Sequence, residues 1–451
     1  MAPAIIKRAN LETAIPETRL TGELARTCGQ LRLFAEVVEE GSWLDARIDN
    51  ADPIRKPLPK PSIRSMHKPL GPVAVFGASN FPLAFSVAGG DTASAFAAGN
   101  PVIVKAHPAH PGTSALVGEA VRESVKACGL PEGVFSMLFD AGIEIGVQLV
   151  KHPAIKAVAF TGSFAGGTAL MKLAAARPEP IPCYSEMGSV NPVFVLPGAL
   201  KQRGSAVATG LQASFTLGAG QMCTKPGIVL LSRQQQSAAF TAKLSELVEQ
   251  AQPFTLLTAG IARDYARGTG HRGAIAALVA QAAMPDTSPA CPANAQFFTT
   301  SLDEFLREPA LSEEIFGPNT LLVHCDSSAD YLRAAHALDG HLTATLLGTE
   351  EDLANNRELI AVLEQKAGRL IFNGFPTGVE VAPAMVHGGP YPSTSDARFT
   401  AVGSAAIFRF ARPVCFQNFP DALLPDELQS QNPLSIQRLI DGVPSRDPLT
   451  S

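Results

Sequence analysis

Short apolar runs alternate with longer amphipathic stretches between residues 71 and 161. Four of these runs predict buried strands, at 73–76, 101–104, 134–139 and 157–160. The stretches between them predict helices, at 84–98, 113–128 and 143–151. Strands that alternate with helices at this spacing favour a parallel sheet covered on both faces. Ligands of such sheets bind at the carboxyl ends of the strands.

A second series of apolar runs follows and predicts a second α/β unit. Its strands are expected at 192–195, 227–231, 295–299, 320–324, 343–347 and 369–373, with a helix at 203–217. Residues 11–40 carry apolar positions at helical spacing and predict a helical segment. The segment 41–70 is punctuated by prolines and predicts an extended arm at an edge, because proline cannot donate a ladder hydrogen bond. The polar tail over 421–451 is expected to be loosely ordered.

The composition describes a folded protein without a nucleic-acid or membrane signature. At 451 residues the chain is long enough for two or three lobes, and 46% hydrophobic residues exclude a disordered chain. A net charge of -5 gives no electrostatic attraction to nucleic acid or to an anionic membrane. No apolar run is long enough to cross a bilayer, and the first residues lack the apolar core of a signal peptide. The seven cysteines form no CxxC pair, so we expect no disulfide framework, no metal site and a cytoplasmic location.

Three short motifs carry candidate chemistry, and each also has a structural explanation. The turn at 162–167 follows a strand and opens a helix, where backbone N–H groups can hold a phosphate. Thr168 stands where a P-loop needs lysine, so a tight turn is the alternative. Cys223 follows small residues that leave room for a substrate at its sulfur, although a free cysteine is also a common core residue. Glu186 is either a functional buried carboxylate or an exposed loop residue.

Seven segments, in this order, resemble motifs of the NAD(P)-dependent aldehyde dehydrogenase superfamily, and the resemblance covers about residues 15–420. The segments are FGASNFP from Phe76, VKAHP from Val104, FTGS from Phe160, EMG from Glu186, GQMC from Gly220, EIFGP from Glu314 and FN from Phe372. The resemblance implies an α/β fold with two parallel-sheet, Rossmann-type domains and a β-strand arm used for oligomerisation. The implied parts are a cofactor domain over 1–186 with its arm at 45–70, a catalytic domain over 187–392, and a return to the cofactor domain and arm over 393–420, with a strand near 404–412.

The family's chemistry implies roles for three side chains. A thiolate at Cys223 would attack the aldehyde carbon to give a thiohemiacetal, which loses hydride to the nicotinamide and becomes a thioester. The amide of Asn80 and the backbone N–H of Cys223 would form the oxyanion hole. Glu186 would activate the water that hydrolyses the thioester, and it can also accept the thiol proton.

The resemblance also implies where the cofactor and the substrate bind. The implied cofactor residues are Lys105 at the adenosine ribose, Gly162, Ser163 and Gly167 at the pyrophosphate, and Glu314 with Phe316 at the nicotinamide ribose. The implied substrate residues are Phe81 and Phe85 in the tunnel. A 2-oxo-carboxylate substrate also needs a cation, for which Lys225, His387 and Arg398 are candidates, and the alternative for each is a solvated surface charge or a satisfied loop residue.

Four departures from the family pattern refine these expectations. Pro108 stands where many NAD-preferring members carry glutamate, so we expect NADP to be used at least as well as NAD, with His107 or His110 assisting Lys105. Residues 88–91 lack the lysine that often follows the oxyanion asparagine. The segments 372–380 and 384–392 are similar to the branch that oxidises 2-oxoglutarate semialdehyde (2,5-dioxopentanoate). The chain also starts late, because family members carry a substantial segment ahead of the helix that opens here.

The leading interpretation is an NADP-preferring 2-oxoglutarate semialdehyde dehydrogenase that acts as a homodimer or homotetramer. A broad-specificity or fatty-aldehyde dehydrogenase would use the same chemistry. A hypothesis of another class is a non-catalytic, N-terminally truncated product. Retention of Asn80, Glu186, Cys223 and Glu314 argues against that last hypothesis.

Overall fold

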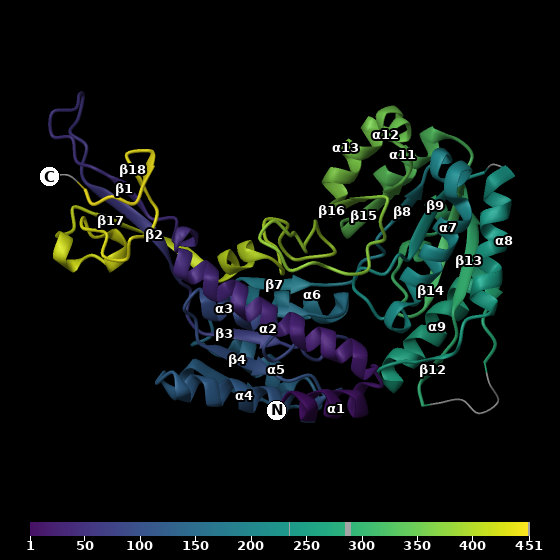
Figure 1. Ribbon diagram of the computed structural model, residues 1–451, viewed down its shortest axis with the longest axis horizontal. Helices are drawn as coiled ribbons and strands as arrows, with labels where there is room; N and C mark the ends of the chain where they lie inside the picture. The colour runs from purple at the N-terminus through teal and green to yellow at the C-terminus, as the bar shows by residue number, and fades with distance from the viewer. Residues whose placement is uncertain (234, 285–289, 450–451) are drawn as a thin grey trace.

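The protein is built from two helix-covered sheets and a third, outlying sheet (Figure 1). The computed structural model describes residues 1–233, 235–284 and 290–449. The second sheet lies at the right of Figure 1, the outlying sheet at the left, and the first sheet between and below them. Within the described ranges, no helix combines the length and the apolar character needed to cross a membrane.

The first sheet has five strands, and every neighbouring pair is parallel. In spatial order they are β5 Phe135–Leu138, β4 Val102–Lys105, β3 Val73–Phe76, β6 Ala157–Thr161 and β7 Cys183–Glu186. Val73 and Val75 pack in the layer of α1 Ala2–Thr13, α2 Glu17–Glu40, α3 Gly90–Ala97 and α4 Pro111–Ala127. Ala74 and Phe76 face the opposite layer, formed by α5 Glu144–Lys151 and α6 Phe164–Ala175.

The second sheet has seven strands and is parallel except at its edge strand β11 Ala277–Gln281. After β11 the order is β13 Gln296–Ser301, β14 Asn319–Cys325, β9 Ile228–Ser232, β8 Val193–Val195, β15 His341–Leu347 and β16 Ala367–Phe372. One face is covered by α7 Pro197–Thr216 and α8 Gln235–Glu249, the other by α10 Leu302–Arg307, α11 Ser328–Ala337 and α13 Arg357–Lys366. The remaining elements are α9 Ala259–Ile275, α12 Glu350–Asn355 and the small pair β10 Phe254–Thr255 with β12 Pro292–Ala293.

The predicted α/β class with two mainly parallel sheets is confirmed, and the predicted strands of both series are present. The domain boundaries stay a prediction. The helical segment expected over 11–40 is interrupted, because α1 ends at Thr13 and α2 begins at Glu17. Ala14 takes a left-handed conformation with φ 56, and Pro16 disfavours helical backbone at the residue before it.

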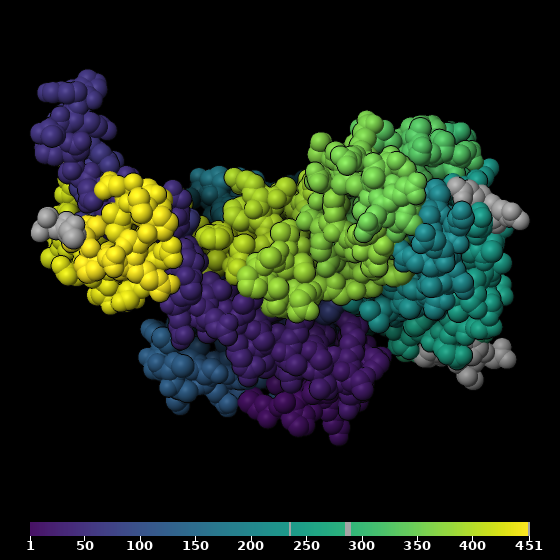
Figure 2. All heavy atoms as spheres, turned by 45° about the horizontal axis from the view of Figure 1, so that its top comes forward, coloured from purple at the N-terminus to yellow at the C-terminus, as the bar shows by residue number. Residues whose placement is uncertain are grey.

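The outlying sheet combines segments from both ends of the chain. Its order is β17 Ala411–Gln417, β2 Ile63–Pro69, β1 Arg47–Asp49, β18 Arg438–Ile440 and β19 Val443–Ser445. It forms a projecting lobe at the left of Figure 2. The strand expected near 404–412 starts later, since Ser404–Phe410 is a 3-10 helix whose Ile407 and Phe410 are buried in the core of the first sheet.

The tail from residue 421, expected to be loosely ordered, is instead built into this lobe as far as residue 449. Strand β18 pairs in parallel with β1 and antiparallel with β19. The buried side chain of Arg438 donates hydrogen bonds to the main-chain carbonyls of Gln429 and Asp447. Leu428 packs with Met66 in the small apolar cluster of the lobe. The polar composition of the tail concealed this order, because its pairing partner lies near the other end of the chain.

Trp43 lies where the outlying sheet joins the rest of the molecule. It is the only tryptophan of the chain and belongs to the 3-10 helix Ser42–Leu44 that follows α2. The half-buried side chain packs against the core of the first sheet and also against the small cluster that contains Met66 and Leu428. Trp43 therefore contacts both the core of the first sheet and the projecting lobe.

Candidate active site

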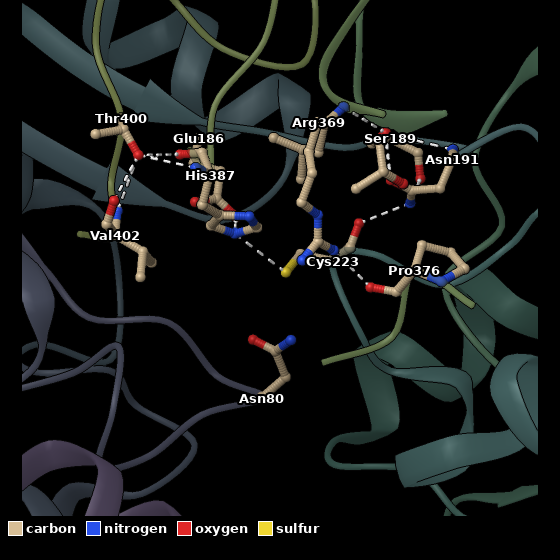
Figure 3. A network of polar contacts seen from close by, with 12 residues as sticks. Asn80, Glu186, Ser189, Asn191, Cys223, Arg369, Pro376, His387, Thr400 and Val402 are labelled. Carbon is tan, nitrogen blue, oxygen red and sulfur yellow. Dashed lines mark hydrogen bonds and ion pairs between the residues drawn. The ribbon is translucent and has the colours of Figure 1, made fainter. Parts of the chain in front are cut away.

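Three reactive side chains meet between the first and second sheets (Figure 3). Cys223 follows the turn after α7, Glu186 ends β7, and His387 lies on the segment that leads from the second sheet back to the first. The Nε2 atom of His387 lies 3.6 Å from Cys223 Sγ and 2.9 Å from Glu186 Oε1. Glu186 and His387 are buried, and Cys223 is half-buried. One imidazole nitrogen is therefore within reach of both the sulfur and the carboxylate.

A tight loop fixes the position of Cys223. Residues 218–220 all take left-handed backbone conformations, with φ of 59, 60 and 67. A Cβ added at Gly220 would lie 2.2 Å from the carbonyl carbon of Gly317, so only glycine allows this close approach. The side-chain amide of Asn191 donates a hydrogen bond to the Cys223 carbonyl at 2.9 Å. The small residues before Cys223 are therefore needed for the left-handed backbone and the close packing of this loop.

Backbone contacts hold the two partners of Cys223. Glu186 forms an isolated antiparallel bridge with Thr394, and the backbone N–H of His387 donates to Thr400 Oγ1 at 2.8 Å. The ring centroid of Phe85 lies 6.1 Å from that of His387. The Oε2 atom of Glu186 is buried and has no hydrogen-bond partner in the described part of the chain. This oxygen can therefore accept a proton or a water molecule.

The surroundings of Cys223 favour its neutral thiol. Burial raises the pKa of Cys223 well above its usual value, and the negative charge of Glu186 raises it further. At neutral pH the sulfur therefore needs a base. The 2.9 Å contact with the carboxylate assigns the resting proton to His387 Nε2. His387 can then pass this proton to Glu186 Oε1 and take the proton of Sγ, which leaves a thiolate beside a neutral imidazole.

The side-chain amide of the buried Asn80 points toward the sulfur of Cys223 (Figure 3). Its amide nitrogen donates to the Gln221 carbonyl at 3.0 Å, which ties Asn80 to the loop of Cys223. The backbone carbonyl of Asn80 accepts a hydrogen bond from Arg19 at 2.8 Å, and this guanidinium lies 4.9 Å from the ring centroid of Phe81. The second N–H of the Asn80 amide can bind an oxygen that lies at the sulfur.

The carboxyl ends of β4 and β6 carry residues expected at a dinucleotide. Lys105 ends β4, and its ammonium donates to the Asp140 carbonyl at 3.2 Å. Burial lowers the pKa of Lys105, and Asp140 opposes this shift. Pro108 is exposed nearby, and Gly162 and Ser163 are exposed at the start of α6. The accessible N–H groups of this helix start fit a phosphate, and the ammonium of the largely buried Lys105 at the end of β4 fits a ribose or a ribose phosphate.

Two glycines permit close packing beside Glu186. A Cβ added at the buried Gly167 would lie 2.6 Å from Met187, so this glycine lets α6 pack closely rather than presenting its backbone to a ligand. A Cβ added at Gly188 would lie 2.4 Å from Glu314 Oε2. Burial raises the pKa of Glu314, and Phe316 is half-buried two residues later.

Two of the three cations expected for a substrate carboxylate point elsewhere. Lys225 is fully buried and donates to the Ile315 carbonyl at 2.8 Å, so its ammonium is engaged inside the fold. Arg398 is exposed and pairs with Asp396 at 2.6 Å. His387 does lie in the site, but its Nε2 faces Cys223 and Glu186 rather than a separate substrate group.

The two histidines near Lys105 add no positive charge there. His110 is buried, and its Nε2 lies 2.9 Å from the Ala78 carbonyl. Burial, together with the charges of His110 and Lys105, lowers the pKa of His107 to about 3. Both rings are thus neutral at pH 7, because burial also lowers the pKa of His110. Neither ring therefore brings a positive charge to a phosphate, and the assistance expected of His107 or His110 stays a prediction.

Sequence reasoning missed two arginines at this site. Arg369 on β16 extends toward Cys223 (Figure 3), and the guanidinium of Arg26 on α2 lies 5.7 Å from the ring centroid of Phe85. Arg369 interrupts the otherwise apolar strand AGRLIF, which was an available signal. Arg26 is one of several charged residues on an amphipathic helix and gave no signal of its own.

Cys223, His387 and Glu186 also form, within the described residues, the one group of three possible metal ligands, with their ligand atoms within 4.8 Å of one another. Hydrogen bonding accounts for these distances without an ion. The expectation that the protein uses no metal stays a prediction.

Comparison with known proteins gives matches over nearly the whole chain. A sequence profile described as "Aldehyde dehydrogenase family" matches residues 2–261. Alpha-ketoglutaric semialdehyde dehydrogenase 2 of Azospirillum brasilense is 52% identical over 442 residues, which are 98% of this chain and 84% of that protein. Alpha-ketoglutaric semialdehyde dehydrogenase of Acinetobacter baylyi is 47% identical over 96% of this chain and 82% of its own length. A solved 1-pyrroline-5-carboxylate dehydrogenase shares the fold, with a TM-score of 0.77 at 20% identity over 92% of this chain and 77% of that chain.

Proposed function

Since the chain belongs to the aldehyde dehydrogenase family of NAD(P)-dependent oxidoreductases, we propose that it oxidises 2-oxoglutarate semialdehyde to 2-oxoglutarate. The observation that carries the chemistry is the contact of His387 Nε2 with both Cys223 Sγ and Glu186 Oε1. The substrate is supported by the printed names of the two relatives, which are 52% and 47% identical to this chain.

The first half of the reaction uses Cys223 as the nucleophile. The relay through His387 leaves a thiolate, which adds to the aldehyde carbon to form a thiohemiacetal. The Asn80 amide and the Cys223 N–H stabilise the resulting oxyanion, since the hydrogen bond from Asn80 to the Gln221 carbonyl holds the Asn80 amide beside the loop of Cys223. Bound NAD(P) would supply the hydride acceptor for the oxidation of this adduct to a thioester.

The second half of the reaction uses Glu186 as the base. Its Oε2 atom is buried without a partner among the described residues and can hold the attacking water. Once the proton on Oε1 has been released, the carboxylate accepts a proton from this water as the water attacks the thioester carbon. Cys223 then leaves as a thiolate and the carboxylate product is free to depart.

Cofactor binding is proposed for the residues at the strand ends. Gly162 and Ser163 at the start of α6 would hold the pyrophosphate, Lys105 the adenosine ribose, and Glu314 with Phe316 the nicotinamide ribose. Pro108 places no carboxylate at the exposed position beyond Lys105, which supports a preference for NADP.

Pro108→Glu should shift the cofactor preference toward NAD. A carboxylate here would accept hydrogen bonds from a ribose 2′-hydroxyl and repel a 2′-phosphate, at a cost of about 1 kcal/mol or more. We expect the ratio of kcat/KM for NADP to that for NAD to fall roughly tenfold. Steady-state kinetics with both cofactors measures this ratio. A wild-type enzyme that uses NAD efficiently and NADP hardly at all would refute the proposed preference.

The substrate proposal predicts a preference for aldehydes with a distal carboxylate. The kcat/KM for 2-oxoglutarate semialdehyde should exceed that for pentanal by at least about tenfold, because a charge-assisted contact contributes about 1.5–3 kcal/mol. The measurement is steady-state oxidation of both aldehydes at saturating NADP. Comparable values would instead favour the broad-specificity or fatty-aldehyde alternative, which uses the same three side chains.

Self-association through the outlying sheet, as a homodimer or homotetramer, is also part of the proposal. Strands β17 and β19 are the two edges of this sheet, so each leaves backbone groups without a strand partner there. Phe419, Leu423 and Val443 are large apolar side chains of this lobe that are exposed. Exposed apolar groups beside free edges are typical of a surface that packs against a second copy.

A further inference from the structure

Two arginines from different parts of the fold bind the same short segment beside the reactive sulfur. Arg369 on β16 donates to the carbonyl of Pro376 at 2.8 Å and to that of Gly378 at 3.2 Å. Arg26 on α2 donates to the carbonyl of Val379. Residues 376–379 therefore lie between an arginine of the second sheet and an arginine of the helix that covers the first sheet.

Neither guanidinium is neutralised by a carboxylate in direct contact. Within the described part of the chain, neither Arg26 nor Arg369 forms a salt bridge, and Glu23 and Glu380 act on Arg26 only through longer-range attraction. The Nε atoms of both arginines and one Nη atom of Arg26 are buried without a hydrogen-bond partner among the described residues. Buried N–H groups without a partner on a half-buried guanidinium are costly, so an anion that pairs with them would be bound favourably.

The positive charges of Arg26 and Arg369 both lie near Cys223, the proposed nucleophile. Burial lowers the pKa of Arg26 and of Arg369, and electrostatic attraction to Cys223 opposes this shift in both. The side chain of Arg369 extends beside Cys223 (Figure 3). Arg26 stacks on Phe85, whose ring in turn lies 6.1 Å from the ring of His387. Both guanidiniums therefore lie close enough to Cys223 for electrostatic interaction with the sulfur.

We propose that Arg26 and Arg369 bind the carboxylate of a short 2-oxo acid while its aldehyde carbon lies at Cys223 Sγ. This inference rests on the proposed function and assigns the substrate cation that Lys225 and Arg398 do not supply. The substrate has four C–C bonds of about 1.5 Å, so its carboxylate lies roughly 5 Å from the aldehyde carbon. A cation beside the sulfur thus suits this chain length. The planar fork of arginine also matches a carboxylate with two parallel hydrogen bonds.

The test compares two aldehydes of equal length in variants of the full chain. We would measure kcat/KM for 2-oxoglutarate semialdehyde and for pentanal in the wild type, Arg369→Met and Arg26→Met. The preference for the semialdehyde should fall at least about tenfold in each variant, while kcat/KM for pentanal stays within about threefold. Arg369→Lys keeps the charge but not the fork, so it should keep part of the preference.

A matched control is Arg398→Met. Arg398 is exposed and paired with Asp396, so this substitution removes an arginine that lies outside the proposed site. The preference for the semialdehyde should remain at the wild-type value. Glutarate gives a second measurement, since it should inhibit pentanal oxidation competitively, and its inhibition constant should rise at least about tenfold in the two Met variants.

Each outcome separates this inference from the proposed function. A wild type without any preference for the semialdehyde would refute the proposed substrate. A clear wild-type preference that both Met variants retain would overturn the arginine site and leave the proposed function standing. An equal loss on both aldehydes, with unchanged inhibition by glutarate, would mean that the arginines only hold residues 376–379, and would also overturn the site.

Discussion

Replacing Cys223 with alanine should abolish aldehyde oxidation while NADP still binds. Alanine cannot form the covalent adduct, and loss of a covalent nucleophile costs several kcal/mol, so kcat should fall on the order of a thousandfold or more. The backbone contact of Gly220 with Gly317 and the hydrogen bond from Asn191 to the Cys223 carbonyl hold the loop without using the sulfur, so the loop should persist. Steady-state turnover and the fluorescence of bound NADPH measure the two effects.

The matched control for this experiment is Cys128→Ala. Cys128 is exposed at the end of α4 and does not belong to the candidate active site, so its replacement should leave kcat unchanged. Turnover of Cys223→Ala within about tenfold of the wild type would reject Cys223 as the nucleophile.

His387→Ala should lower kcat by about 10²–10⁴, the range typical of a lost proton-transfer group. Burial and Glu186 raise the pKa of Cys223, so without His387 most sulfur at neutral pH stays a thiol. Because the folded-state pKa is raised, the thiolate fraction grows as pH increases toward that pKa. The rate of the variant should therefore rise about tenfold per pH unit above neutrality, whereas the wild type should respond less. A pH profile of kcat for both enzymes measures the difference.

The control is His336→Gln, an exposed histidine at the end of α11. It should keep the wild-type pH profile and turnover. If His387→Ala shows an unchanged kcat and a parallel pH profile, the sulfur loses its proton by another route and His387 is only a packing residue.

The sequence predicted the two main sheets well because their strands are short, fully buried and separated by helices. Val73–Phe76 and Val193–Val195 have no exposed residue, so each appears in the sequence as a continuous apolar run. The outlying sheet was harder to predict, since β1 and β18 are three-residue strands that pair across almost the whole length of the chain. Local patterns contain no information about such a partner.

The site shows the same division between local and non-local signals. Asn80, Glu186 and Cys223 could be proposed from the sequence because each lies in a recognisable motif at a strand end or tight loop. The orientation of His387 toward Glu186 depends on residues 201 positions apart in the chain, and no short motif reports it. The buried state of Lys225 and the direction of Arg369 likewise follow from packing between elements, which a sequence pattern does not specify.

The position of Trp43 gives the enzyme a built-in optical reporter. Because this is the only indole in the chain, the tryptophan emission comes from one place, the junction between the first sheet and the projecting lobe. Its half-buried ring contacts apolar groups on both sides, so separation of the lobe would expose the indole to water and shift its emission to longer wavelength. The wavelength of this emission can therefore report, without any label, whether the lobe stays packed against the first sheet while denaturant, temperature or ligands are varied.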